Sequence, residues 1–85
     1  MKSVNVKIFT TPTCPRCPEA KAIIKEISME FDIVVDEIDL SQDPITGLQY
    51  QVASAPSVVV NDYVVARGSV PEKDELIMQI ERAME

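Results

Sequence analysis

The chain has 85 residues, which fits a single small domain over 1–85, because chains of this size bury only about 60–65% of their unfolded surface. Hydrophobic residues make up 46% and charged residues 26%, as in an ordinary soluble globular protein. Eight basic and fourteen acidic residues give a net charge of −6, which argues against nucleic acid or an anionic membrane as the main partner. The sequence lacks the run of about 20 apolar residues that spans a membrane. Because residues 1–7 alternate in polarity, we expect no export signal and a cytoplasmic protein.

The chain contains no His and only two Cys. Without imidazole there can be no histidine general base and no Cys–His or Ser–His pair. Two cysteines alone cannot build a four-coordinate structural zinc site within one chain, so we expect no bound metal. Any catalysis must therefore depend on the two sulfur atoms, those of Cys14 and Cys17.

The first strand and the first helix are predicted from their apolar spacing. Over residues 4–9 apolar side chains recur at every second position, at Val4, Val6 and Ile8. From about residue 15 to 31 they recur every three or four residues, as on an amphipathic helix, at Ala20, Ile23, Ile24, Ile27 and Phe31. The N-cap of this helix is expected at Thr13 or Cys14, with Pro15 in the first turn.

A second strand and a short helix are predicted next. The strand begins at residue 33, is rich in Ile and Val, and ends at Asp39-Leu40. Ser41-Gln42-Asp43-Pro44 is a helix start signal, with Asp43 as the N-cap and Pro44 as the first helical residue. The helix is expected to run to about residue 51 and to be weak, because it contains Gly47.

The last third of the chain predicts a hairpin and a helix. Two apolar runs, 57–60 and 63–66, are separated by Asn61-Asp62, which is a two-residue hairpin signal. Gly68 ends the second run, and Ser69-Val70-Pro71-Glu72 fits a capping box before the last helix. The apolar face of that helix is predicted to consist of Leu76, Ile77, Ile80 and Met84.

The order of the predicted elements is β-α-β-α-β-β-α. A long helix joins the first two strands, so these strands should be parallel with a right-handed crossover. The last two strands should form an antiparallel hairpin. We therefore expect an α/β fold in which three helices flank a four-stranded mixed sheet.

Cys14-Pro15-Arg16-Cys17 stands where the first strand meets the first helix. A C-x-x-C at this place in a βαβ unit is typical of a thioredoxin-like redox site. The unpaired N–H groups and the dipole of the helix N-terminus stabilise a thiolate, and thiols in that setting have pKa values of about 3.5–7.5. We therefore expect Cys14 to be the nucleophile, with Arg16 adding positive charge nearby. Cys17, one turn into the helix, should be more buried and should attack the mixed disulfide that Cys14 forms.

The alternative interpretation of the two cysteines is structural. They could form an ordinary disulfide or lie inert in the core. A structural disulfide is unusual in a reducing cytosol. An inert pair has no reason to stand together at the N-terminus of a helix.

A second feature, Ala55-Pro56-Ser57, opens the third strand. Taken alone, a proline at a strand entrance is compatible with simple punctuation between elements. Together with the C-x-x-C and the order of elements, it makes the chain resemble the thioredoxin/glutaredoxin superfamily over essentially its whole length. Within that superfamily the chain is most similar to the small archaeal thioredoxins of glutaredoxin size. The residues that carry the resemblance are 9–18 (FTTPTCPRCP), 55–57 (APS) and Gly68.

The resemblance implies a thioredoxin-like fold and the activity of a thiol–disulfide oxidoreductase, which reduces protein disulfides with a dithiol. In such proteins the first cysteine attacks and the second resolves the intermediate, so the catalytic residues would be Cys14 and Cys17. The proline that faces the disulfide is cis in the family and maps to Pro56. The backbone of the preceding residue, Ala55, would pair with an extended substrate segment. Gly68 would keep the surface beside the disulfide open to partner proteins.

Further site residues and partners also follow from the resemblance. Pro15, Arg16 and Pro56 would modulate the active site. Thr13 would contact the substrate together with the Ala55 backbone and Gly68. The expected partners are disulfide-containing target proteins and an electron donor of the thioredoxin-reductase type. No cofactor is expected beyond the Cys14–Cys17 disulfide, and a monomer suffices.

The chain departs at several positions from the family that it resembles. Larger thioredoxins have Trp where this chain has Thr13, and Gly-Pro where it has Pro15-Arg16. Their buried Asp, which assists proton removal from the second cysteine, falls near Ile8 by ungapped counting. The proton acceptor for Cys17 is therefore unidentified, with water or a carboxylate outside the motif as candidates.

Two rival functions are open. One is a glutaredoxin-like electron carrier, for example for ribonucleotide reductase. A glutathione site looks degraded, because Pro71 offers neither an N–H nor a carboxylate, although Arg67 can still attract a carboxylate. The other rival is a small metal carrier, and Thr13, Pro15 and the order of elements argue against it. The acidic run Asp36, Glu37 and Asp39 is interpreted as a solvated strand edge instead of a metal site.

Overall fold

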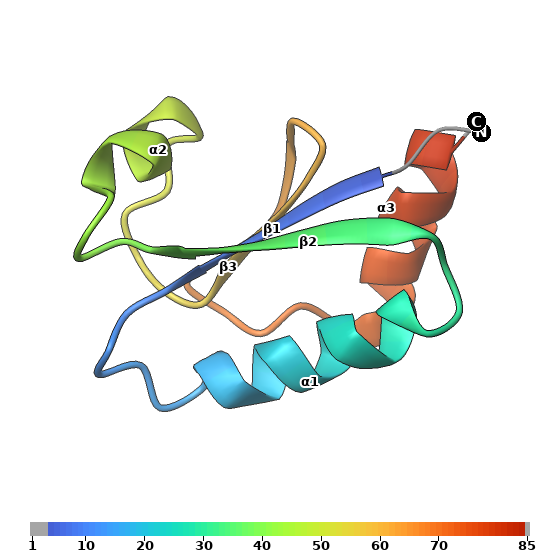
Figure 1. Cartoon of the computed structure of the whole chain (residues 1–85), viewed down its shortest axis with the longest axis horizontal. Helices are drawn as coiled ribbons and strands as arrows, with labels where there is room; N and C mark the ends of the chain where they lie inside the picture. Colours follow the sequence, from blue (N-terminus) through green and yellow to red (C-terminus); the bar gives the residue numbers. More distant parts are fainter. Residues whose placement is uncertain (1–3, 85) are drawn as a thin grey trace.

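The computed structural model describes residues 4–84. Residues 1–3 lie outside this range. They are the first part of the segment from which we expect no export signal. The described elements are β1 (Val4–Thr10), α1 (Cys17–Ser28), β2 (Ile33–Asp39), α2 (Pro44–Gln49), β3 (Ser57–Val60), β4 (Tyr63–Arg67) and α3 (Lys73–Met84). Their order is the predicted one (Figure 1).

The four strands form one mixed sheet in the order β2-β1-β3-β4. β1 runs parallel to β2 and antiparallel to β3, and β3 and β4 form the antiparallel hairpin. The predicted sheet is therefore confirmed. Phe9 at the end of β1 pairs with Ser57 at the start of β3. The segment that leads from β1 to the cysteines and the segment that leads from Pro56 into β3 therefore lie at the same end of the sheet.

Helices cover both faces of the sheet. α1 and α3 lie on one face, and α2 lies on the other face (Figure 1). Because side chains alternate along a strand, β1 contributes to both layers of the core. The buried residues of the α1/α3 layer are Val4, Val6, Ile8, Ala20, Ile24, Ile27, Val58, Val60, Leu76 and Ile80. The smaller layer under α2 contains Phe9, Val52 and Val59.

The predicted start of the first helix was wrong. Its N-cap is Arg16 instead of Thr13 or Cys14, and the helix begins at Cys17. An N-cap at Thr13 would require a helical Cys14, which is disfavoured because Cys14 precedes a proline. The Cys14 N–H instead donates to the Thr11 carbonyl oxygen at 3.2 Å in a turn before the helix. The helix also ends at Ser28, so Phe31 lies beyond its end, although it still packs against the core.

The predicted capping box of the last helix was also wrong. α3 begins at Lys73, four residues after Ser69, and the Leu76 N–H donates to the Glu72 carbonyl oxygen at 3.0 Å. Ser69 is too early because a proline follows at position 71 and disfavours helical backbone at the residue before it. The predicted apolar face is confirmed, with Leu76 and Ile80 fully buried.

The two remaining turns follow the sequence signals. Asp43 caps α2 by accepting hydrogen bonds from the Thr46 N–H at 3.2 Å and the Thr46 hydroxyl at 2.7 Å. Gly47 allows a close approach, since a Cβ there would lie 2.8 Å from the Val52 carbonyl oxygen. Asn61 begins the β3–β4 turn with φ of +52°, a value that Asn tolerates better than most residues. Within residues 4–84, no helix combines the length and the apolar run needed to cross a membrane.

Candidate active site

The two cysteines form a disulfide at the N-terminus of α1. Their Cα atoms are 5.6 Å apart. Cys14 is half-buried in the turn before the helix, whereas Cys17, the first residue of the helix, is only 4% exposed. The expected difference in burial between the two sulfurs is confirmed. Cys17 is not one turn inside the helix as predicted, because the helix begins later.

The positive charge expected from Arg16 is shared with an acidic neighbour. Arg16 Nε lies 3.7 Å from Glu19 Oε2, and the two side chains are 61% and 59% exposed. Solvent screens an exposed pair of this kind, so it contributes little to the field at the disulfide. The main-chain N–H groups of the first turn of α1 also contribute positive potential near Cys14.

The strand register fixes the position of the proline segment, residues 55–56. The Ala55–Pro56 peptide bond is cis, as the resemblance implied. Pro56 is buried and Ala55 is half-buried. Because Ser57 pairs with Phe9, Ala55 and Pro56 lie at the end of the sheet from which the cysteine turn also leaves.

A buried hydroxyl ties this segment to Gly68. The Ser57 side chain is fully buried; its Oγ donates to the Ser54 carbonyl oxygen at 2.6 Å and accepts from the Gly68 N–H at 3.0 Å. Gly68 has φ of +71°, and a Cβ there would lie 2.6 Å from Ser54 Oγ. The resemblance gave Gly68 a role in the site but gave none to Ser57. The available signal was a polar residue opening a strand that otherwise consists of valines.

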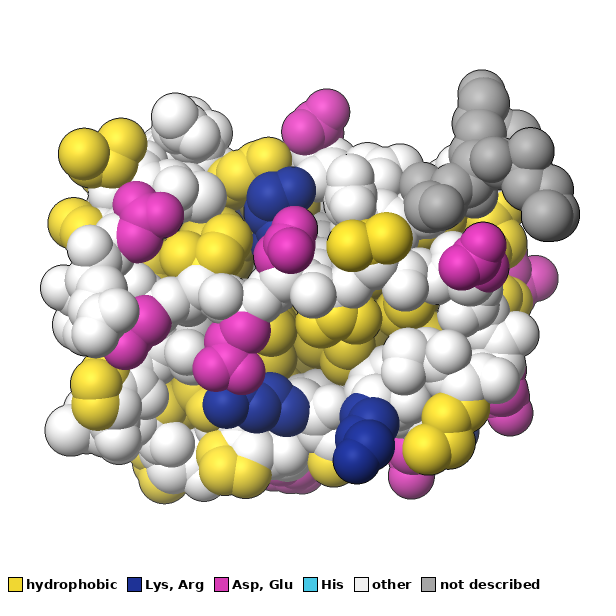
Figure 2. Space-filling model, viewed as in Figure 1, with side chains coloured by type: hydrophobic (Ala, Val, Ile, Leu, Met, Phe, Trp, Pro, Cys, Tyr) yellow, Lys and Arg dark blue, Asp and Glu magenta, His cyan; other side chains and the backbone are white. Residues whose placement is uncertain are grey.

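A cleft runs from the disulfide toward the end of β2. It has a volume of about 340 Å³. The residues that line it are Thr10, Thr11, Pro12, Cys14, Cys17, Pro18, Lys21, Glu37 and Asp39. Figure 2 shows apolar side chains in a hollow between β2 and α1, with an acidic and a basic side chain in contact beside it. Lys21 Nζ lies 2.9 Å from Glu37 Oε1 across this gap.

Sequence reasoning missed the acidic and basic residues of the cleft. It treated Glu37 and Asp39 as a solvated edge and gave Lys21 no role. The parallel pairing of β1 and β2 brings the end of β2 beside the cysteine turn. The usable signal was helical spacing, because Lys21 stands four residues after Cys17 and shares its face of α1. Within residues 4–84, no cluster of three or more potential metal ligands is present.

One carboxylate of the cleft has a perturbed pKa. Asp39 Oδ1 accepts hydrogen bonds from the Ser41 hydroxyl at 2.6 Å and from the Ser41 N–H at 2.9 Å. Chiefly the hydroxyl, and then the N–H, hold the pKa of Asp39 below its usual value of 3.8. Asp39 is therefore ionised at neutral pH and is a weak proton acceptor.

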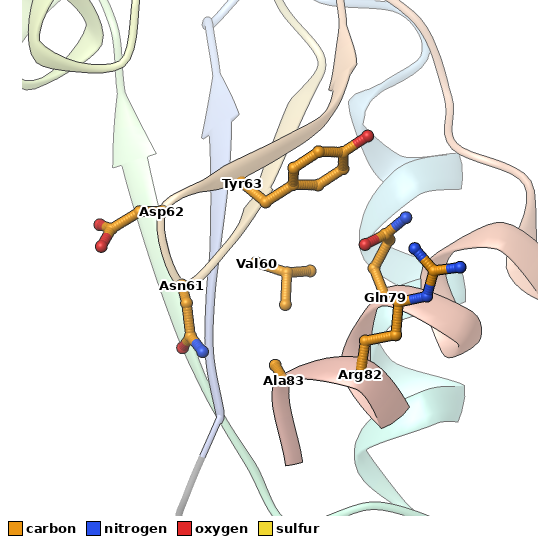
Figure 3. Close-up of a pocket in the computed structure, with 7 residues that line it drawn as sticks. All are labelled: Val60, Asn61, Asp62, Tyr63, Gln79, Arg82 and Ala83. Atoms are coloured by element: carbon orange, nitrogen blue, oxygen red, sulfur yellow. The ribbon is translucent and has the colours of Figure 1, made fainter. Parts of the chain in front are cut away.

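A second hollow lies at the other end of the sheet (Figure 3). It is bounded by the β3–β4 turn and the C-terminal half of α3, where Tyr63 and Arg82 contribute side chains. The turn adjoins the start of β1, since the Asn61 N–H donates to the Asn5 carbonyl oxygen at 2.7 Å. None of the residues that line this hollow is a cysteine. The redox chemistry therefore belongs to the cleft at the opposite end of the sheet, which Cys14 and Cys17 line.

The comparison with known families agrees with this geometry. The sequence model of the thioredoxin domain matches residues 4–81. The chain belongs to the thioredoxin family. It is 30% identical over 86 residues to a thioredoxin of Methanocaldococcus jannaschii, covering 99% of this chain and 100% of the relative. It is 36% identical over 84 residues to a probable thioredoxin of Methanothermobacter thermautotrophicus, covering 96% and 98% of the two chains.

The same fold occurs in a solved structure of a thioredoxin mutant from Halobacterium salinarum. The two structures superpose with a TM-score of 0.82 at 21% identity, over 99% of this chain and 77% of the other. The resemblance noted in the sequence is thus confirmed for both family and fold. This thioredoxin-family protein is a protein thiol–disulfide oxidoreductase with a C-x-x-C cysteine pair.

The residues predicted for the site fall into three groups. Cys14 and Cys17 are joined directly. Ala55, Pro56 and Gly68 lie at the same end of the sheet as the cysteine turn, where Ser57 links the proline segment to Gly68. The other three residues, Thr13, Pro15 and Arg16, are exposed on the cysteine turn.

Proposed function

We propose that the protein reduces disulfides of other proteins and that Cys14 is the attacking thiol. The observation that carries this assignment is the difference in burial, because half-buried Cys14 can meet an incoming disulfide whereas Cys17 is only 4% exposed. The Cys14 thiolate attacks one sulfur of the substrate disulfide and expels the other as a thiolate. Cys17 then attacks Cys14, which releases the second substrate thiol and leaves the Cys14–Cys17 disulfide. Two electrons thus pass to the substrate.

The substrate segment binds at the end of the sheet next to the cysteine turn. Ala55 offers its backbone there, and Thr13 and Gly68 form the flanking surface. Support comes from the positive φ of Gly68, which favours a residue without a side chain, and from its hydrogen bond to Ser57. Pro15, Arg16 and Pro56 modulate the reactivity of the two thiols.

The electron donor is a reductase of the thioredoxin-reductase type, which returns the disulfide to the dithiol. Residues 1–85 act as one domain and as a monomer in the cytoplasm. The redox-active group is the cysteine pair itself, with no additional cofactor. Disulfide-containing proteins are the substrates, and nucleic acids and membranes are not partners, in agreement with the net charge of −6.

Single-cysteine variants test this assignment. Cys14→Ser should lose insulin-disulfide reduction, because no attacking thiol remains. Cys17→Ser should accumulate a stable mixed disulfide with a substrate, because the resolving thiol is missing. A fully active Cys14→Ser protein would refute the assignment. Catalytic acceleration of a glutathione mixed-disulfide assay would favour the glutaredoxin-like alternative.

A further inference from the structure

The second half of the reaction requires a group that removes a proton from Cys17. A thiol must become a thiolate before it attacks a disulfide, and the ordinary thiol pKa of about 8.5 leaves Cys17 mostly protonated at neutral pH. Cys17 is 4% exposed, so bulk solvent has little direct access to its sulfur. The chain has no His. The charged side chains that line the cleft next to Cys17 are Lys21 of α1 and Glu37 and Asp39 of β2.

The two carboxylates of the cleft differ in the contacts that they make. Asp39 accepts two hydrogen bonds from Ser41, and these lower its pKa. The Glu37 carboxylate is held through Oε1 by Lys21 Nζ at 2.9 Å, and its side chain is 52% exposed, so the group reaches the water of the cleft. Asp39 Oδ1 is thus occupied by Ser41 of its own loop, whereas the Glu37 carboxylate faces α1, the helix that carries Cys17.

Lys21 stands on the same helix as Cys17 and forms an ion pair with Glu37. It stands four residues after Cys17 on α1, and residues at this spacing lie on the same face of a helix. Its ammonium group holds Glu37 from across the gap between α1 and β2. The same positive charge at the wall of the cleft favours a thiolate over a thiol.

We propose that Glu37 accepts the proton of Cys17 through water in the cleft and that Lys21 is the positioning residue for Glu37. The cleft volume of about 340 Å³ exceeds the roughly 30 Å³ that one water occupies in the liquid. The Cys17 proton passes through water to Glu37, and the Cys17 thiolate attacks Cys14 of the mixed disulfide. The departing substrate thiolate recovers the proton from Glu37 through water. This inference rests on the proposed roles of the two cysteines.

The test is a single-turnover measurement of substrate release from the mixed disulfide, recorded as a function of pH. Glu37→Gln keeps the size of the side chain but removes the acceptor, and release should slow by about tenfold at pH 7. This is below the usual 10²–10⁴ for a positioned base, because water can partly substitute. The difference should shrink as the pH rises, because hydroxide then removes the Cys17 proton. Alkylation of Cys14 in the reduced protein should keep its wild-type rate.

Two controls use the same strand. Asp36→Asn makes the same change of charge on β2, but its side chain lies on the opposite face of the sheet and outside the cleft. Asp39→Asn removes the weak acceptor. Both variants should release substrate at nearly the wild-type rate. Lys21→Gln should slow release at neutral pH and recover at high pH in the same way as Glu37→Gln.

The outcomes separate this inference from the proposed function. An active wild-type protein with unchanged release in Glu37→Gln at every pH would overturn the role of Glu37. An equal slowing of Glu37→Gln at all pH values would also overturn it, because this indicates a structural effect. A wild-type protein that forms no mixed disulfide, or a fully active Cys14→Ser, would instead refute the proposed function.

Discussion

Replacement of Ser57 by Ala tests the hydroxyl that joins the proline segment to Gly68. The Ser57 Oγ donates at 2.6 Å to the Ser54 carbonyl oxygen and accepts at 3.0 Å from the Gly68 N–H. Each intramolecular hydrogen bond contributes about 1 kcal/mol net, and an unsatisfied buried partner costs about 1–3 kcal/mol. Because water can reach the exposed Gly68 backbone, Ser57→Ala should lower the free energy of unfolding by about 2 kcal/mol. For a domain of this size the melting temperature should fall by roughly 10 °C.

The assay is urea unfolding of the oxidised protein, followed by circular dichroism, with thermal melting as a second readout. The matched control is Ser69→Ala, which removes an exposed hydroxyl one residue after Gly68 and should change stability by less than about 0.5 kcal/mol. A loss below about 0.5 kcal/mol in Ser57→Ala would show that the two hydrogen bonds do not hold the segment. An equal loss in the control would point to a cause other than this hydroxyl.

Two further predictions concern backbone strain and acid stability. Gly68→Ala should lower the free energy of unfolding in urea by about 1–2 kcal/mol, because an alanine at φ of +71° occupies the left-handed region. Most of this loss should persist in a Ser54→Gly background, which removes the contact at 2.6 Å but not the strain. Full recovery of stability in that background would contradict the strain argument. Ser41→Ala should raise the pKa of Asp39 toward 3.8 in an NMR titration, because the hydrogen bond that lowers it most is removed. Since the folded-state pKa is lowered, the stabilisation by Ser41 is complete above about pH 3.8 and is lost as the pH falls through the folded-state pKa; an unchanged Asp39 titration would count against this assignment.

Much of the architecture follows from local patterns. Period-two apolar spacing predicted β1, and the Asn61-Asp62 pair predicted the hairpin turn, because side-chain alternation and turn conformation are properties of a few neighbouring residues. The helix starts were the weak points. The Cys14 N–H is used in a turn with Thr11, and the proline at 71 restricts the residue before it, so both helices begin later than their polar N-terminal signals indicated.

The sequence by itself determined the family, the order of the elements and the cysteine pair, because these depend on residue identity and short-range spacing. Only the tertiary structure decided what surrounds the disulfide. Glu37 and Lys21 are 16 positions apart, and they meet because β2 pairs parallel to β1 and α1 packs alongside. Ser57 and Gly68 are joined by a buried hydroxyl whose partners depend on strand register. Side-chain contacts across elements arise from packing, and a linear pattern of residue types does not encode them directly.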